Sequence, residues 1–353
     1  MKLNNQYFCV NQRFNQAGFS LVELMVGLVI GLLATLAIMQ MMGTFDSQKR
    51  TTTGTADAQT NGNIALYSIA RDIQSAGYGL MFTGTHDDKF SAIDCTSLSI
   101  AAGEAAAVAG MTGVADLTPV TIVDGGATGS DSITIRSADN TSLAGLPSRI
   151  INRAGSTITI ASNLGCKNND FVLINNAGAC AMTKLDAVGL AGEIQVILDG
   201  LETVPAAAAE GAVLSCLGNW RIDTFAVNGG NLQLNGADSV ADIVNMQAQY
   251  GVSASANSNK ITSWVSATGG TYGTAMTVAT RNRIKAVRVA VVSRNPKAEN
   301  ADVSASCSFT TDAGLVVDLS GDANCKRYHY SVYETIIPLR NMIWSKDPPP
   351  PAP

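Results

Sequence analysis

Histidine and charged residues are scarce in this chain of 353 residues. His86 and His329 are its two histidines, and charged residues make up 14% of the sequence. Because histidine is the commonest general base and a frequent metal ligand, this scarcity argues against most hydrolases and zinc enzymes. The seven cysteines form no CxxC pair, and no GxSxG, P-loop or dinucleotide-binding motif is present. We therefore predict no enzyme, no metal and no cofactor.

Two short stretches contain metal-ligand residue types without a complete site. "HDDK" at 86–89 places a histidine beside two acids, a pattern more typical of a solvated loop. "DLSGDANC" at 318–325 has oxygen ligands at loop spacing but lacks the glutamate that closes a calcium loop. We predict that neither stretch holds a metal.

A surplus of positive charge is also missing. The net charge is −5, which gives no reason to expect that the whole molecule binds nucleic acid. Four basic residues after residue 280 could contact DNA phosphates or a partner's acids, and the spacing of the first three places them on one face of a strand: Arg281, Arg283, Lys285 and Arg288. An edge strand protected by charge is the simpler interpretation. The low charge and 33 glycines favour a β-rich protein outside the cytoplasm.

Charge is almost absent from one long run near the amino terminus. Between Gly18 and Phe45 the only charged residue is Glu23, and the run exceeds the ~20 residues that cross a bilayer. We predict a helix over 19–50 that spans the membrane over 19–45. Gly27 and Gly31 form a GxxxG pattern that permits close helix packing. A lone carboxylate deep in lipid costs on the order of 3 kcal/mol, so Glu23 requires a compensating partner.

The start of this run, "GFSLVE", resembles the cleavage and methylation motif of type IV prepilins and secretion pseudopilins. The resemblance implies that a prepilin peptidase cuts between Gly18 and Phe19 and methylates the new amino terminus on Phe19. It also implies that Glu23 pairs with the Phe19 ammonium of a neighbouring subunit. A paired charge is tolerated in an apolar filament core where an unpaired one is not. An uncleaved signal anchor is the alternative interpretation of the same run.

The last third of the chain sharpens this resemblance. "DIVNMQAQYGV", "RIKAVRVAVVSRN" and "YSVYETIIPLRNMIW" resemble the PilW family of minor pilins. The implied fold class is α+β, with a long amino-terminal helix and a disulfide-bonded antiparallel β-rich head. We divide the chain into a leader (1–18), the pilin helix (19–80), a variable β-rich region (81–235), a PilW-like region (236–345) and a proline-rich tail (346–353).

The resemblance implies a minor subunit that primes pilus assembly and lies at or near the tip, with a role in adhesion or motility. The implied partners are other minor pilins, the major pilin, the prepilin peptidase, the inner-membrane assembly platform and a tip adhesin. The chain would start in the inner membrane with its head in the periplasm and end in the extracellular fibre. The alternatives are a type II secretion pseudopilin, or a pilus-mounted adhesin or DNA-uptake module.

Removal of the leader also removes Cys9 and leaves an even number of cysteines in the head. Six cysteines allow fifteen pairings, so their connectivity stays open, and some could be buried thiols. Short loops favour Cys166–Cys180 and Cys307–Cys325, which would leave Cys95 with Cys216. An oxidising compartment is the setting in which such bridges form.

Glycines, apolar periodicity and β-branched runs predict the secondary structure of the rest of the chain. Gly54 and Gly62 predict a kink or loosened section over 51–63, and helix resumes with Leu66, Ile69, Ala70 and Ile73 on one face against the head. Short β-branched runs predict strands from residue 97 to 176, with a hairpin around 228–231. We predict a further helix over 239–250 and two long closing strands at 283–295 and 328–344.

Overall fold

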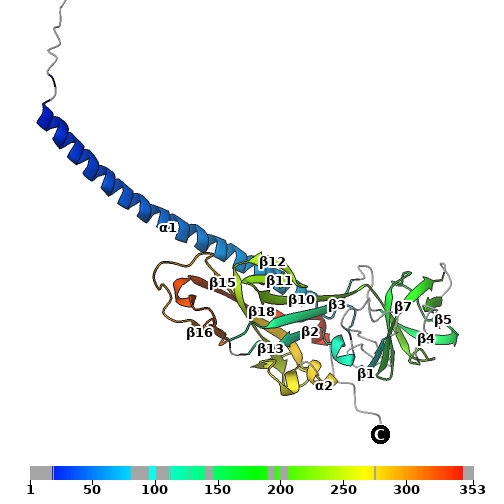
Figure 1. The fold of residues 1–353 in the computed structure, drawn as a ribbon. Helices are drawn as coiled ribbons and strands as arrows, with labels where there is room; N and C mark the ends of the chain where they lie inside the picture. Colours follow the sequence, from blue (N-terminus) through cyan, green and yellow to red (C-terminus); the bar gives the residue numbers. More distant parts are fainter. Residues whose placement is uncertain are drawn as a thin grey trace, which may run out of the picture. The chain divides into compact units, whose positions relative to one another are not determined.

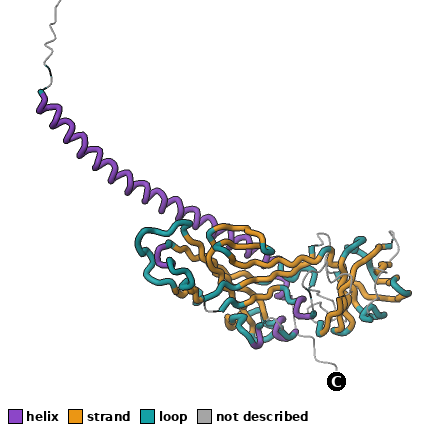
Figure 2. Tube along the Cα trace, viewed as in Figure 1, coloured by secondary structure: helices purple, strands orange, loops and turns teal. Residues whose placement is uncertain are grey.

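The computed structural model describes residues 18, 20–80, 95–100, 111, 113–126, 128–139, 146–189, 195–198, 206–273 and 276–344. One long helix, α1 (Leu21–Ser75), is followed by a head built almost entirely of strands (Figures 1 and 2). The chain divides into a unit that ends at Thr53 and a unit that begins at Gly54. Residues 1–17 of the leader, "HDDK" and the proline-rich tail lie outside the described residues.

The predicted break in the helix over 51–63 is wrong, because α1 runs without interruption through this section (Figure 1). Gly54 and Gly62 are both buried. A Cβ atom on Gly54 would lie 2.1 Å from Oδ1 of Asn295, and one on Gly62 would lie 2.3 Å from the ring of Tyr333. These glycines therefore allow close approach of the helix to the head, and that packing offsets their poor helix propensity.

The predicted contact face of the second half of α1 is confirmed. Ile69 and Ile73 are fully buried, and Leu66 and Ala70 pack against the same core from its margin. The last helical residue is Ser75, and Gly77 follows with φ of +74°, the left-handed conformation in which glycine commonly ends a helix. The sequence periodicity of this half was therefore a reliable guide to burial.

Two sheets share one core with this half of α1. The five-stranded sheet has the order β12-β11-β10-β3-β2 and contains β2 (Val120–Val123), β3 (Ser132–Ala138), β10 (Trp220–Asn228), β11 (Asn231–Leu234) and β12 (Ala237–Ala241). The four-stranded sheet has the order β14-β13-β15-β18 and contains β13 (Ile243–Ser253), β14 (Ile261–Val265), β15 (Ile284–Arg294) and β18 (Tyr330–Pro338). The predicted hairpin is confirmed as β10–β11, and the predicted closing strands contain β15 and β18.

The predicted helix over 239–250 is wrong, because this segment forms β12 and most of β13. Met246, Ala248 and Tyr250 pair with Val291, Val289 and Val287 of β15 across an antiparallel ladder. All six side chains belong to the same core. Burial between two neighbouring strands outweighs the local helical spacing, which is a weak determinant of structure.

A second, seven-stranded sheet has the order β1-β7-β6-β9-β4-β5-β8. Its strands are β1 (Ser97–Ile100), β4 (Pro147–Ala154), β5 (Thr157–Ile160), β6 (Phe171–Asn176), β7 (Ala179–Val188), β8 (Gln195–Leu198) and β9 (Val213–Gly218). An additional pairing of β7 with β8 closes β7, β6, β9, β4, β5 and β8 into a ring. The β1–β7 pair is parallel, and the other pairs are antiparallel. Closure leaves fewer free edges for unwanted pairing.

The described part of the chain contains three disulfides, and two of the predicted pairings are wrong. Cys307–Cys325 is confirmed, whereas Cys95 pairs with Cys180 and Cys166 pairs with Cys216. Strand β6 lies between Cys166 and Cys180 in the chain, and at about 3.3 Å per residue it carries the two cysteines apart. Pairing of β7 with β1, and of β9 with β6, brings the true partners together.

Short elements complete the head. They are α2 (Val278–Arg281), the strand pair β16 (Ser308–Thr310) and β17 (Val316–Asp318), and 3₁₀ turns at Val114–Leu117, Gly270–Tyr272, Cys325–Arg327 and Arg340–Trp344. The Cys307–Cys325 bridge closes the segment that carries β16 and β17. This segment therefore holds its shape with few ladder hydrogen bonds.

Asp131 joins the two sheets of the first core. Its carboxylate oxygens accept hydrogen bonds from the backbone N–H groups of Gly125 (2.9 Å) and Ala248 (2.7 Å), and its own N–H donates to the carbonyl of Met246 (2.8 Å). Burial raises the pKa of this carboxyl to about 6, and the two backbone donors lower it by less than burial raises it. The carboxyl therefore binds its proton more tightly in the folded protein than in the unfolded chain.

We expect Asp131 to contribute stability that is fully present below about pH 4 and is lost as the pH rises through about 6. The Asp131→Asn variant lacks this titration and leaves one backbone N–H facing an amide NH₂ group, at a cost of about 1–3 kcal/mol. Urea unfolding from pH 4 to 7 should show the wild-type advantage shrinking as pH rises. A parallel pH dependence in both proteins would contradict the assignment.

Candidate assembly surface on the N-terminal helix

Glu23 lies in the first turn of α1, where its side chain is exposed. The helix begins at Leu21, directly after the "GFSLVE" start, and Leu24 N–H donates to the carbonyl of Ser20 (3.1 Å). A carboxylate in the first turn interacts favourably with the unpaired N–H groups at the positive end of a helix. Gly18 is described and exposed, whereas Phe19 lies outside the described residues.

A shallow groove runs along α1 from Glu23 to Thr35. Its lining residues are Glu23, Leu24, Gly27, Leu28, Gly31, Leu32 and Thr35. Glu23, Gly27, Gly31 and Thr35 follow at intervals of four and therefore share one helix face. A Cβ atom on Gly27 or Gly31 would meet no atom within 4 Å, so the missing side chains leave space that this chain does not fill. Such a face allows another helix to approach closely.

Thr35 closes the groove at the end opposite Glu23, and the sequence interpretation did not single it out. Its hydroxyl donates to the backbone carbonyl of Gly31 (3.0 Å) or Leu32 (2.9 Å). The polar atom is therefore satisfied within its own helix, which makes it tolerable in an apolar setting. The sequence feature that could have identified Thr35 is its position four residues after Gly31, which continues the spacing of Gly27 and Gly31.

The rest of this helix half is apolar and exposed. The large side chains that α1 leaves exposed here are Leu21, Val22, Leu24, Met25, Val26, Leu28, Val29, Ile30, Leu32, Leu33, Leu36, Ile38, Met39, Met41, Met42 and Phe45. The most apolar 18-residue window of α1 has a mean hydropathy of 2.5, and none of that window is buried. By length and composition this helix could cross a membrane. Outside a membrane or a filament, so large an apolar surface would be unfavourable.

The four basic residues predicted as a group, from Arg281 to Arg288, do not form an open surface for nucleic acid. Arg281 is buried and donates to the carbonyls of Val114 (2.7 Å) and Cys95 (3.1 Å). Lys285 is also buried, and its ammonium donates to the carbonyl of Met342 (3.0 Å). These cations bind separate segments of the head to each other.

The interpretation of this basic segment as a charge-protected edge strand is wrong. Strand β15 lies between β13 and β18, so it is a central strand. Arg288 stacks over the ring of Trp264, with 5.0 Å between its guanidinium carbon and the ring centroid, and it donates to Gln249. The Arg283 Nε–H donates to the carbonyl of Ser253 (2.9 Å).

The described part of the chain contains no group of three or more metal-ligating side chains. In the 318–325 stretch, Asp318 accepts from the N–H of Ser320 (2.8 Å), and Asp322 accepts from the guanidinium of Arg294 (3.0 Å). These oxygens are engaged in turns and an ion pair.

Two family models match this chain. The prokaryotic N-terminal methylation motif matches residues 13–39, which include Gly18, Glu23 and both groove glycines. The type IV pilus-assembly protein W model, PilW, matches residues 223–341, from strand β10 to the end of the four-stranded sheet. Together, these two matches support a PilW-family type IV pilin. No curated protein and no solved structure matches it.

The matches support a structural pilin role in type IV pilus assembly, and the motif with its apolar helix supports a membrane anchor at the amino terminus. The matches also imply interaction with other pilus components. The PilW match leaves out the seven-stranded sheet, whose strands all precede residue 223. Strand β10 spans this boundary, because it pairs with β3 on one side and with β11 on the other.

Proposed function

We propose that this pilin is a minor subunit that helps to initiate the filament and occupies a sparse position at or near its tip. The observation that carries the proposal is the groove with Glu23 at one end and Gly27 and Gly31 along its length, on a helix that is otherwise apolar and exposed. A self-contained membrane anchor has no need for a carboxylate at this position. A subunit that packs its helix against the helix of another subunit does need this carboxylate, because it can pair with a charge of the neighbour.

In the proposed mechanism, a prepilin peptidase cuts between Gly18 and Phe19, and residues 19–45 hold the mature chain in the inner membrane. Glu23 then pairs with the amino terminus of Phe19 in an adjacent subunit. Removing both charges from water is costly, and their mutual attraction and hydrogen bonding offset that cost only when the two groups meet. The pair therefore also fixes the axial stagger between subunits.

The size of the head supports a sparse position. The head carries a closed seven-stranded sheet in addition to the two sheets that surround the second half of α1. A repeating lattice of such heads would be crowded, and one copy beside smaller pilins would not. Because Glu23 is retained, we place the subunit below the outermost tip member, with other minor pilins and the major pilin as partners. The PilW match favours a pilus over a secretion pseudopilus.

The proposal is tested by the amino terminus of the protein in native membranes and in sheared filaments. Mass spectrometry should find a chain that begins at methylated Phe19, abundant in membranes and present in trace amounts in filaments. An intact Met1 start confined to membranes would overturn the proposal and leave only a membrane anchor. Stoichiometry equal to that of the major pilin would overturn the minor role.

A further inference from the structure

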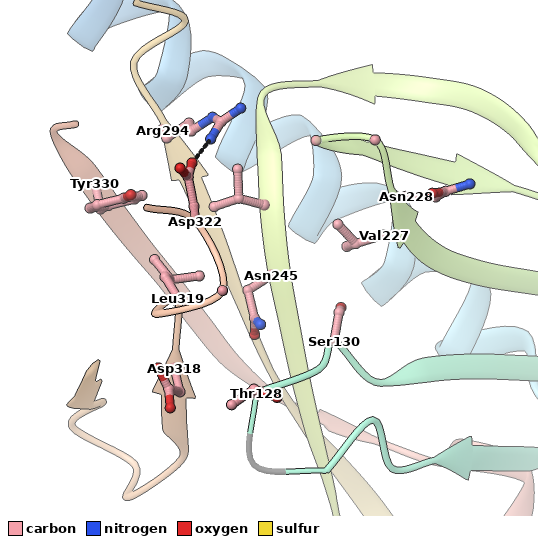
Figure 3. A pocket seen from close by; sticks show the side chains of 14 residues that line it. Thr128, Ser130, Val227, Asn228, Asn245, Arg294, Asp318, Leu319, Asp322 and Tyr330 are labelled. Carbon is pink, nitrogen blue, oxygen red and sulfur yellow. Dashed lines mark hydrogen bonds and ion pairs between the residues drawn. The ribbon is translucent and has the colours of Figure 1, made fainter. Parts of the chain in front are cut away.

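The head contains a cavity of about 330 Å³ that is separate from the helix groove. Figure 3 shows it between the segment around Leu319, the segment from Thr128 to Ser130 and the start of strand β13. The lining residues are Thr128, Ser130, Val227, Asn228, Gly229, Gly230, Val244, Asn245, Arg294, Asp318, Leu319, Gly321, Asp322 and Tyr330. This volume lies at the lower end of the range of small-molecule sites, roughly 300–1,000 Å³.

The walls of the cavity are fixed by contacts between distant parts of the chain. The Ser130 hydroxyl accepts from the N–H of Met246 (2.9 Å), which anchors the β2–β3 connection on β13. Arg294 binds the carboxylate of Asp322 (3.0 Å), as the dashed line in Figure 3 shows. The Cys307–Cys325 bridge closes the loop that carries Asp318 and Asp322. A site with walls held in this way is formed before a ligand arrives, which reduces the entropy cost of binding.

The β10–β11 turn forms another wall without large side chains. Gly229 and Gly230 have φ values of +60° and +82°, which suit glycine and leave the turn backbone accessible. A side chain on Gly229 would meet no atom within 4 Å. The part of the cavity next to this turn is therefore available to a ligand.

Asn245 supplies a buried polar group to the cavity. It is 2% exposed, and Figure 3 shows its amide pointing into the space between Leu319 and Ser130. Its Oδ1 accepts from Gln247 (3.0 Å), while its Nδ2 makes only a long contact of 3.5 Å with the carbonyl of Gly129. An amide carries two donors and two acceptor lone pairs, so bonding capacity remains on this side chain.

Arg294 and Tyr330 contribute further polar groups to the cavity lining. Within the described part of the chain, the Arg294 Nε–H has no hydrogen-bond partner, although its guanidinium contacts Asp322 and stacks over Tyr328 at 4.5 Å. Burial also raises the pKa of Tyr330 to about 12, so its hydroxyl stays protonated as both donor and acceptor at neutral pH.

The charges of the lining select against an anion. Among the described lining residues the one cation, Arg294, is already paired with Asp322, and Asp318 adds a further negative charge. Hydroxyls, two amides and carboxylates dominate, and Leu319, Val227 and Val244 provide small apolar areas. We propose that this cavity binds a neutral, hydroxyl-rich ligand the size of one sugar ring, such as the terminal residue of a surface glycan. The proposal is independent of the assembly role of Glu23.

The test uses the full chain in lipid nanodiscs, because sugar-headed detergents would compete for the cavity. Galactose, mannose, N-acetylglucosamine and, as the anionic contrast, N-acetylneuraminic acid are titrated to about 10 mM, where ligands with millimolar Kd are detected. Saturation-transfer NMR should show saturable binding of at least one neutral sugar and none of the anion. The triglycine peptide is included as a probe of a different ligand class.

Two variants change the lining of the cavity without removing a side chain from the hydrophobic core. Thr128→Trp fills its rim at an exposed position, and Asp318→Asn removes a charged acceptor; each should weaken neutral-sugar binding by about tenfold. Asp302→Asn is the matched control, because it removes an exposed carboxylate that is not part of the lining, and it should leave binding unchanged. Absence of neutral-sugar binding, binding unaffected by both cavity variants, or binding of triglycine alone would each overturn the proposal.

Discussion

Replacing Glu23 with valine should leave the amount of protein in the membrane unchanged and reduce its incorporation into filaments by at least about tenfold. The substitution removes a charge from an apolar segment, so membrane insertion becomes more favourable. In the assembled filament, however, it would leave the amino-terminal ammonium of the adjacent subunit buried and unpaired. Breaking one side of a buried charge pair typically costs about 3–5 kcal/mol. The ratio of filament to membrane protein on immunoblots measures the effect.

Two further variants separate charge pairing from a general change in the helix. Glu23→Asp keeps the charge and should retain part of the incorporation, because a shorter side chain weakens the pair without abolishing it. Asp46→Asn changes another exposed carboxylate of α1, outside the groove, and should leave incorporation unchanged. Incorporation of the valine variant at the wild-type level would refute the pairing role of Glu23.

Removing the Cys166–Cys216 disulfide should destabilise the seven-stranded sheet by about 4 kcal/mol. The two cysteines are 50 residues apart, and a cross-link of that span restricts the unfolded chain by roughly this amount. We expect the Cys166→Ser, Cys216→Ser double variant to exchange backbone amide hydrogens faster in β6 and β9. Strands β13 and β15 belong to the other core and should keep their protection. Hydrogen exchange read by mass spectrometry resolves the two regions.

The Cys307→Ser, Cys325→Ser variant provides the comparison. Its cysteines are only 18 residues apart, so the expected loss is smaller, about 3 kcal/mol, and it should be confined to the β16–β17 segment. Equal protection of β6 and β9 in the wild type and in the Cys166–Cys216 double variant would show that the closed sheet does not depend on this bridge. Faster exchange in β13 as well would show that the head unfolds as one cooperative unit.

Local sequence patterns predicted the elements whose stability depends on their own residues. The apolar run after Gly18 and the face formed by Ile69 and Ile73 predicted the two halves of α1 correctly. The β10–β11 hairpin was predicted because its Asn-Gly-Gly-Asn turn is specified by residues next to each other. Each of these signals lies within one continuous stretch of the sequence.

Patterns that required a distant partner were misleading. Val240, Ile243, Val244 and Tyr250 have helical spacing, yet β13 is a strand because β15 and β14 lie on either side of it. Gly54 and Gly62 indicated a broken helix. Their actual role is to allow close packing against Asn295 and Tyr333, and these contacts are known only from the folded structure. In both cases the competing tertiary contacts are far away in the sequence.

The sequence alone determined the membrane-length helix, the position of Glu23 within it, the β-rich composition of the head and the even number of cysteines that follow the leader. Tertiary structure decided which cysteines pair, which strand is central and which cations are buried. It also assembled the cavity around Asn245 from segments about two hundred residues apart in the chain. The physical reason is that periodicity and composition act over a few residues, whereas pairing, burial and cavities depend on neighbours that only folding brings together.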